Sequence, residues 1–523
     1  RKSGDSVRIT AQLIKANDGF HLWSETYDRR LDDIFRIQDE IAESVAVALR
    51  TRLLGEDESV VEAQANISPD AYARFIAARS RIAEGGHEDL VNARTALEEI
   101  IDEAPDYAPA YAALAIASLE QWRGPRTIPA TEARGIAKEA IERALALSPD
   151  DDYVVTAHGV YLSELVENAS DAGLRRVNDV FRRAIELNPE NVEAMYYLAF
   201  NLRYLEEYEE TLDLLDRALR IDPLDTSARS LRIWALIENG RFEEAIAYID
   251  ETLRLFPEEL DFYFRGVQAE YVRGRPDRAL AWLYALNAKG AGNTFLTQRE
   301  YELATSLGYT EGADQALEAL RSADDISAEL FEAARALDAE EGLRVVRRGI
   351  EQDGWANWEV EHFFTAIMAD ECNTAFESRF AGRVLREWSE GDPRVDSTND
   401  NRAAWTALCM RRTGQDELAD ALLRATLDYA APRPGRFDDP GLRSRRMAAY
   451  AMLGEKAQSI AEFQAYYDAG FGALPLIPYE ADPRYVTVAE EPEFQRIVEA
   501  IKARNLRRLE RMIDSDFSLD TPL

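Results

Sequence analysis

"DPLDTSARSLRIWALIENGRFEEAIAYIDETLRLFP", residues 222 to 257, holds two amphipathic helical patterns between two prolines that lie 34 residues apart. Apolar side chains recur every three or four residues in each half, which is typical of a helix with one buried face. A proline ends the second pattern because it lacks a backbone N–H and clashes with the preceding turn. The stretch therefore predicts a pair of helices that pack against each other.

The same proline spacing continues toward the N-terminus. Pro189 lies 34 residues before Pro223, and Pro149 and Pro105 precede it at longer intervals of 40 and 44 residues. Small residues that let two helices approach recur at two positions of the period: Ala115, Gly159 and Ala199 at one, and Ala93, Ala137, Ala245 and Ala279 at the other. A 34-residue helix pair that ends in proline resembles the tetratricopeptide repeat. We predict such repeats over residues 68–290 and degenerate helical repeats over residues 291–475.

The predicted fold class is mainly α, a tetratricopeptide-type α-solenoid. In such an array each unit buries its apolar face only against its neighbours. The N-terminus differs, because "VRITAQLIKANDGFHLWSETYDR", residues 7 to 29, alternates apolar and polar side chains around an Asn-Asp-Gly turn. This pattern predicts a β-hairpin, followed by an amphipathic helix over about residues 32–54.

Both ends of the chain are similar to one family of bacterial signalling proteins. The N-terminal matches are "RITAQL" at 8–13, "HLWSE" at 21–25, "YDR" at 27–29, "IF" at 34–35 and "QDEI" at 38–41, and the C-terminal ones are "DPRY" at 482–485 and "EPEF" at 491–494. The first group resembles the C-terminal half of a TolB-like α/β domain, which often precedes tetratricopeptide repeats. The resemblance implies that residues 1–58 are the remnant of that domain in an N-terminally truncated chain. It also implies that residues 476–523 form the family's C-terminal tail and helix.

Charge and hydropathy argue against contact with nucleic acid and against a membrane-spanning segment. The chain carries 97 acidic and 61 basic residues, a formal net charge of −36, which repels phosphate backbones and anionic lipid. We therefore expect no direct contact with nucleic acid. No apolar run approaches the roughly 20 residues that span a bilayer, so no membrane span is expected.

The sequence offers no pattern for catalysis. Phosphate-binding glycine loops and nucleophile elbows are absent, and the four histidines lack metal-ligand spacing. We therefore predict no catalytic, cofactor-binding or metal-binding residue, no cofactor, and no enzymatic activity for this chain. Two cysteines, Cys372 and Cys409, are too few for a disulfide framework. Both are expected to be small buried apolar side chains.

A binding surface is better supported. In a tetratricopeptide array the first helix of each repeat lines a concave face, and large side chains at equivalent positions form a groove. The predicted groove residues are Tyr196, Tyr197, Phe200, Arg203, Tyr204, Leu231, Trp234, Phe264, Arg265, Gln268 and Tyr271. Aromatic rings with interspersed arginine suit the capture of an extended peptide or a partner helix. The same rings could instead fill the interior of a tight superhelix, and the sequence leaves both interpretations open.

The first functional hypothesis is therefore non-enzymatic: a protein-interaction and signal-input region of a bacterial multidomain regulator, with a protein or peptide partner. The family resemblance implies an alternative, the regulatory part of a class III adenylate or guanylate cyclase or of a winged-helix transcriptional regulator. The expected location is cytoplasmic, or periplasmic if a membrane helix precedes the chain. The partner's identity and the oligomeric state stay open.

Overall fold

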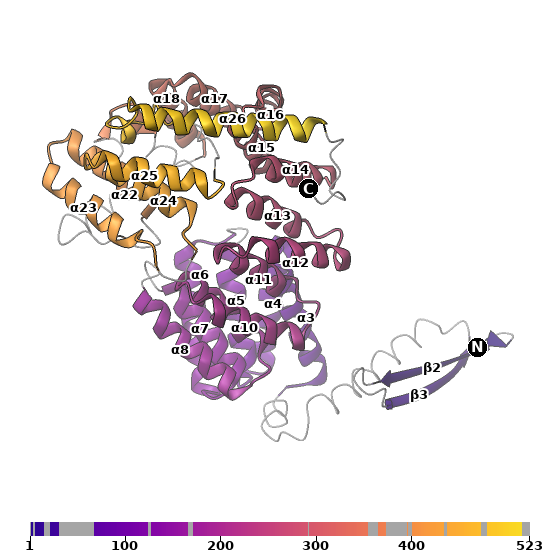
Figure 1. The fold of residues 1–523 in the computed structure, drawn as a ribbon. Helices are drawn as coiled ribbons and strands as arrows, with labels where there is room; N and C mark the ends of the chain where they lie inside the picture. The colour runs from indigo at the N-terminus through magenta and orange to yellow at the C-terminus, as the bar shows by residue number, and fades with distance from the viewer. Residues whose placement is uncertain are drawn as a thin grey trace. The chain divides into compact units, whose positions relative to one another are not determined.

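The computed structural model consists of two compact units, Arg1–Tyr161 and Leu162–Leu523. Figure 1 shows its ribbon. The described residues are 2–3, 6–14, 21–30, 67–123, 127–165, 171–290, 292–353, 365–372, 395, 400–433, 437–471 and 478–514.

Three strands lie near the N-terminus. β1 (Lys2–Ser3), β2 (Ser6–Ile14) and β3 (His21–Arg30) form an antiparallel sheet in the order β1-β2-β3. β2 and β3 occupy the residues for which the hairpin is predicted, with Ile9 opposite Tyr27 and Leu13 opposite Trp23. The predicted turn at 17–19 and the predicted helix at 32–54 lie outside the described residues. The TolB-like remnant therefore stays a prediction.

The helices of the first unit pack around an alanine-rich helix. In chain order they are α3 (Pro69–Glu84), α4 (His87–Glu103), α5 (Ala108–Arg123), α6 (Ala130–Leu147) and the first part of α7 (Asp152–Leu165). α5 packs against both α4 and α6, and its residues from Ala112 to Leu119 are all buried. Alanine side chains let both neighbours approach closely, so the long apolar run of this helix belongs to a protein core.

The second unit continues the helix pairs. Its elements up to residue 353 are α8 (Asp171–Leu187), α9 (Val192–Tyr204), α10 (Tyr208–Ile221), α11 (Thr226–Glu238), α12 (Phe242–Leu255), α13 (Leu260–Val272), α14 (Pro276–Ala288), α15 (Thr294–Leu307), α16 (Thr310–Ala323), α17 (Asp325–Ala336) and α18 (Ala339–Asp353). Consecutive helices pack against one another throughout this series. The prediction of a mainly α repeat protein is confirmed.

The periodic prolines lie where one repeat ends and the next begins. Asp225 caps α11, accepting a hydrogen bond from the Ala228 N–H at 2.9 Å, two residues after Pro223. The Arg229 guanidinium donates to the Pro223 carbonyl at 2.7 Å, and the Tyr263 hydroxyl donates to the Pro257 carbonyl at 3.1 Å. A side chain six residues after the proline thus satisfies a carbonyl that the helix leaves unpaired.

The C-terminal part has its own aromatic core. Its elements are α22 (Asp400–Arg412), α23 (Asp416–Tyr429), α24 (Pro440–Met452), α25 (Lys456–Asp468), the 3₁₀ helix η2 (Pro483–Tyr485) and α26 (Pro492–Asp514). The two motifs of the predicted tail each insert a ring into this core: Tyr485 and Phe494 are buried, with ring centroids 6.0 Å apart. The Asp482 carboxylate accepts the Arg484 N–H at 3.0 Å and so begins η2.

Residues of this C-terminal part also pack along the turns of the earlier repeats. The turns within four successive helix pairs contain Glu206, Gly240, Gly274 and Gly308, all in the left-handed backbone region and 34 residues apart. Arg433 pairs with Glu206 at 2.7 Å, and the Phe437 ring packs on Gly240.

The helix α26 completes this contact line, because it lies against α14 and α15 (Figure 1). The Arg508 Nη1 donates to the Gly274 carbonyl at 2.6 Å, across 234 residues of sequence. The Asn505 Nδ2 donates to the Ser306 carbonyl at 2.9 Å, across 199 residues. The expectation that each repeat packs only against its neighbours is therefore wrong for the second unit. The four turns present backbone groups and glycine surfaces to which a distant helix can bind.

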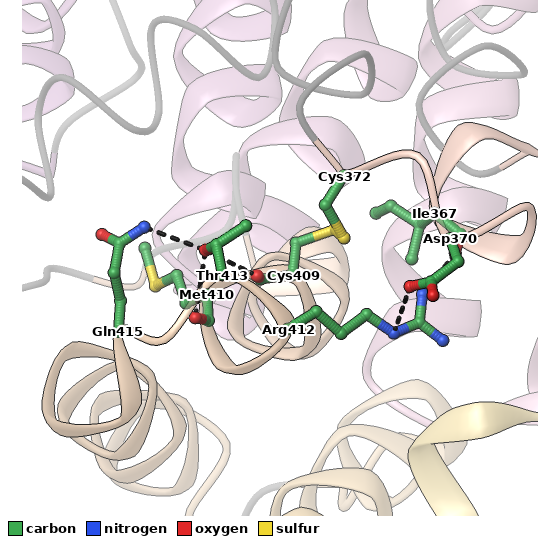
Figure 2. The surroundings of a disulfide bond; sticks show 8 residues. All are labelled: Ile367, Asp370, Cys372, Cys409, Met410, Arg412, Thr413 and Gln415. Atoms are coloured by element: carbon green, nitrogen blue, oxygen red, sulfur yellow. Dashed lines mark hydrogen bonds and ion pairs between the residues drawn. A yellow bond between two sulfur atoms is a disulfide. The ribbon is translucent and has the colours of Figure 1, made fainter.

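The two cysteines form a disulfide bond between residues 365–372 and α22 (Figure 2). Cys372 and Cys409 are buried as expected, but the expectation that they act as separate apolar side chains is wrong. Arg412 strengthens the same junction, donating to the Ile367 carbonyl at 2.6 Å and pairing with Asp370 at 3.1 Å. A sequence separation of 37 residues gave no signal for this pairing, because helix packing alone brings the two residues together.

Candidate functional site

A pocket of about 260 Å³ lies on the first helices of three successive repeats. α9, α11 and α13 supply its lining residues, which are Tyr196, Phe200, Thr226, Ser227, Ser230, Leu231, Trp234, Glu259, Asp261, Phe262 and Arg265. Five of the predicted groove residues are among them: Tyr196, Phe200, Leu231, Trp234 and Arg265. The repeat period brings them together, since residues 34 positions apart take equivalent places on neighbouring helices.

Trp234 is held by two guanidinium groups that lie over its ring and by a hydrogen bond at its nitrogen. The Arg203 guanidinium lies 3.8 Å from the centre of its ring, and the Arg265 guanidinium lies 4.7 Å from it. The indole N–H donates a hydrogen bond to Glu238. Cation–π contacts of this kind hold the ring in place. Trp234 therefore contributes a fixed ring to the pocket.

Arg203 is the buried partner in an ion pair with Glu238. It is 4% exposed and donates from Nη1 to the Glu238 carboxylate at 2.5 Å. Burial raises the pKa of Glu238 above its ordinary value, while the charge of Arg203 and the hydrogen bonds from Arg203 and Trp234 lower it. Arg203 was predicted to line the groove, but in the structure it is not among the lining residues, and its guanidinium lies over the Trp234 ring.

The polar wall of the pocket is a chain of hydrogen bonds between α11 and α13. The Ser230 hydroxyl donates to the Asp261 carboxylate, and the Arg265 Nε donates to the Ser230 hydroxyl at 2.8 Å. The Arg265 Nη1 donates to the Gln268 side-chain oxygen at 2.9 Å. Gln268 therefore orients Arg265 and does not itself line the pocket.

The other predicted residues lie around the pocket. Tyr196, Phe200 and Tyr204 form a row along α9, with adjacent ring centroids 6.5 and 5.4 Å apart. Tyr197 stacks on Phe181 of α8 at 5.7 Å.

On α13, Phe264 packs against Phe295 of α15, with ring centroids 5.8 Å apart. Tyr271 does not line the pocket and is 48% exposed. Tyr204 is 40% exposed. The sequence interpretation missed the polar residues at the starts of α11 and α13, Thr226, Ser227, Glu259 and Asp261. Their position just after each repeat proline could have revealed them.

Residues 230–294, which include much of the pocket, match the family model described as tetratricopeptide repeat. The chain contains tetratricopeptide repeats. Among solved structures, PilW, a widely conserved type IV pilus biogenesis factor, gives 18% identity, with 41% of this chain and 92% of that chain covered and a TM-score of 0.35. A tetratricopeptide repeat protein from Parabacteroides merdae gives 16% identity, 49% and 94% coverage, and a TM-score of 0.34.

One curated relative is named as an enzyme. The chain is 36% identical over 146 residues to "Putative adenylate cyclase 3" of Rhizobium meliloti (strain 1021), which covers 27% of this chain. The same alignment covers 25% of that relative, so the chain spans about a quarter of its length. The relationship is distant and partial.

Around the tetratricopeptide pocket the structure gives no sign of a metal centre. Among the described residues, no three or more His, Cys, Asp or Glu side chains are grouped so that they could hold a metal ion. The helices in the described ranges include none long and apolar enough to cross a membrane. The arrangement at the pocket combines apolar surface, hydroxyls, one guanidinium and two carboxylates, which suits recognition of a side chain and its flanking backbone.

Proposed function

We propose that this chain is the protein-interaction and signal-input region of a bacterial multidomain regulator. Its tetratricopeptide repeats capture an extended peptide segment of a partner protein. The pocket on α9, α11 and α13 is the observation that carries this proposal, because equivalent positions of three repeats supply it. The fixed Trp234 ring and the Ser230–Asp261–Arg265 wall are pre-organised, which lowers the entropic cost of binding.

The test is selection of peptides from a random library on the full chain, followed by affinity measurements on variants. We expect Phe200→Ala and Trp234→Ala to weaken binding of the selected peptides by at least about tenfold while helicity by circular dichroism stays nearly intact. Tyr284→Ala is the matched control, because Tyr284 is an exposed aromatic on α14 that does not line the pocket.

A second variant separates binding from folding. Ser227 is exposed and lines the pocket, so Ser227→Trp fills the pocket without removing a packed side chain. We expect it to abolish peptide binding at unchanged stability. Should Phe200→Ala and Trp234→Ala unfold the repeats, and Ser227→Trp bind peptides normally, the rings belong to the core and the binding proposal fails.

The alternative is that these residues are the regulatory part of a class III nucleotide cyclase, with catalysis carried out elsewhere in the parent protein. The 36% identity to a putative adenylate cyclase supports this alternative. Under either proposal residues 1–523 act by binding and not by catalysis, so incubation of the chain with ATP or GTP should yield no cyclic nucleotide. Turnover by this chain would contradict both. A cyclase catalytic domain in the coding sequence upstream of residue 1 would favour the alternative.

A further inference from the structure

We propose that the pocket selects a peptide in which an apolar side chain lies next to a lysine or arginine, with the cation bound by Glu259. This inference rests on the proposed peptide-binding function and adds the chemistry of the partner. Two halves of the pocket, one apolar and one acidic, carry it.

The apolar half takes the uncharged side chain. Phe200 and Leu231 lie on the first helices of successive repeats, and Phe262 and Trp234 complete the surface. A volume of about 260 Å³ accommodates a large apolar side chain. Because the pocket opens to solvent beside exposed Ser227 and Glu259, the neighbouring residues of the peptide reach the rim.

The charges of the lining residues do not cancel. Arg265 is neutralised by Asp261, whose carboxylate lies 3.3 Å from the guanidinium and also accepts from Ser230. Glu259 is exposed, and within the described ranges no cation lies at ion-pair distance from its carboxylate. It stands at the N-cap position of α13, yet its side chain makes no capping hydrogen bond. A carboxylate at the rim is therefore left for the ligand.

The surroundings favour a cation as well. The first-turn amides of α13 would favour an anion by themselves, but Glu259 and Asp261 already place two negative charges there. Asp222 and Asp225 flank Pro223 at the same end of the neighbouring repeat. The net charge of −36 adds a long-range field that attracts basic segments and repels acidic ones. An acidic peptide would be repelled by the carboxylates at the rim and by the net charge of the whole chain.

The experiment uses the peptides selected on the full chain. Expected sequences carry Lys or Arg within two residues of a large apolar side chain. We expect Glu259→Lys to weaken the basic peptides by at least about tenfold, and to restore binding to versions in which Glu replaces the basic residue. Glu258→Lys is the control, because the Glu258 carboxylate is 82% exposed, pairs with Lys289 at 3.0 Å, and does not line the pocket.

The outcomes distinguish this inference from the function beneath it. Selected peptides that bind Ser227→Trp as well as wild type would defeat the pocket itself. Two other outcomes would overturn the basic specificity but not peptide binding itself. In the first, the selected peptides lose affinity for Ser227→Trp but are neutral or acidic. In the second, basic peptides bind Glu259→Lys as tightly as wild type. Affinity of the basic peptides should also fall as salt is raised from low to physiological concentration.

Discussion

Arg203 shows how much a single residue contributes to this site. Its guanidinium is buried against the rings of Trp234 and Tyr204, with its centre 3.8 and 4.4 Å from theirs, and pairs with Glu238. A buried pair contributes little relative to apolar side chains of the same shape, but loss of one partner leaves the other charge without compensation. Arg203 thus determines both the orientation of Trp234 and the ionisation of Glu238.

Replacement of Arg203 by methionine should cost about 3 kcal/mol of unfolding free energy at neutral pH, the low end for a buried pair because Glu238 is 30% exposed. Urea denaturation monitored by circular dichroism measures this loss. Arg241→Met is the control, since Arg241 pairs with Glu244 at the surface and should contribute less than about 1 kcal/mol.

The same variant should show a distinct pH dependence. The folded-state pKa of Glu238 is raised above 4.5 by burial, and loss of Arg203 removes an interaction that lowers it. In Arg203→Met the folded protein therefore holds this proton to higher pH, and the stability deficit appears as pH rises through that pKa. We expect the deficit to be full at neutral pH and to shrink toward pH 4.5. An equal deficit at both pH values would contradict the role of Glu238.

At the scale of elements, the disulfide between Cys372 and Cys409 links residues 365–372 to α22 within an apolar cluster that also contains Ile367. Its sulfurs are buried, at 4% and 0% residue exposure, so reductants reach them slowly. Disulfides persist in oxidising compartments and are rare in the cytosol. The bond therefore bears directly on the proposed cytoplasmic location and its periplasmic alternative.

The double variant Cys372→Ser/Cys409→Ser should lose up to about 4 kcal/mol of stability, the loop-entropy value for residues 37 apart. Chemical denaturation with and without dithiothreitol measures it, and reductant should affect wild type but not the variant. Alkylation of free thiols during cell lysis then reports whether Cys372 and Cys409 are reduced or oxidised in vivo. Two free thiols accord with the cytoplasm, whereas a closed bond supports the periplasmic alternative.

At the scale of the whole molecule, the C-terminal part is bound to the middle repeats through their turns. Gly274 is in contact with backbone atoms: an added Cβ would lie 2.7 Å from the Phe471 Cα and 2.8 Å from the Gly470 carbonyl oxygen. Gly308 has the same left-handed backbone, yet an added Cβ there would meet nothing within 4 Å. A comparison of substitutions at Gly274 and Gly308 therefore distinguishes the cost of the left-handed backbone from the cost of disrupting the contact with the C-terminal part.

Gly274→Ala and Gly308→Ala should each cost about 1–2 kcal/mol for the left-handed conformation. Gly274→Ala should cost a further 1–3 kcal/mol or so, because the methyl group collides with backbone that cannot move aside. Hydrogen exchange should then show faster exchange in α26 for Gly274→Ala alone. Equal losses for both variants would mean that the C-terminal part does not depend on this turn.

How much the sequence predicted depends on the range of the interactions. The 34-residue period predicted the helix pairs and brought Tyr196, Leu231 and Trp234 near one another, because local pattern and neighbouring packing determine both. It did not predict the disulfide or the contact of Arg508 with Gly274, since each joins residues that no periodic pattern relates. The polar rim of the pocket was missed because Ser227 and Glu259 resemble ordinary helix-start residues.

The row of turns that receives Arg433, Phe437 and Arg508 also limits how this protein can evolve. Tandem arrays commonly gain or lose units by duplication and deletion, since each unit meets only the next. Here, excision of one 34-residue unit would displace Glu206, Gly240 and Gly274 from their separate partners by one place. The number of repeats between residues 206 and 308 is therefore constrained, because each turn must stay opposite its own partner in the C-terminal part.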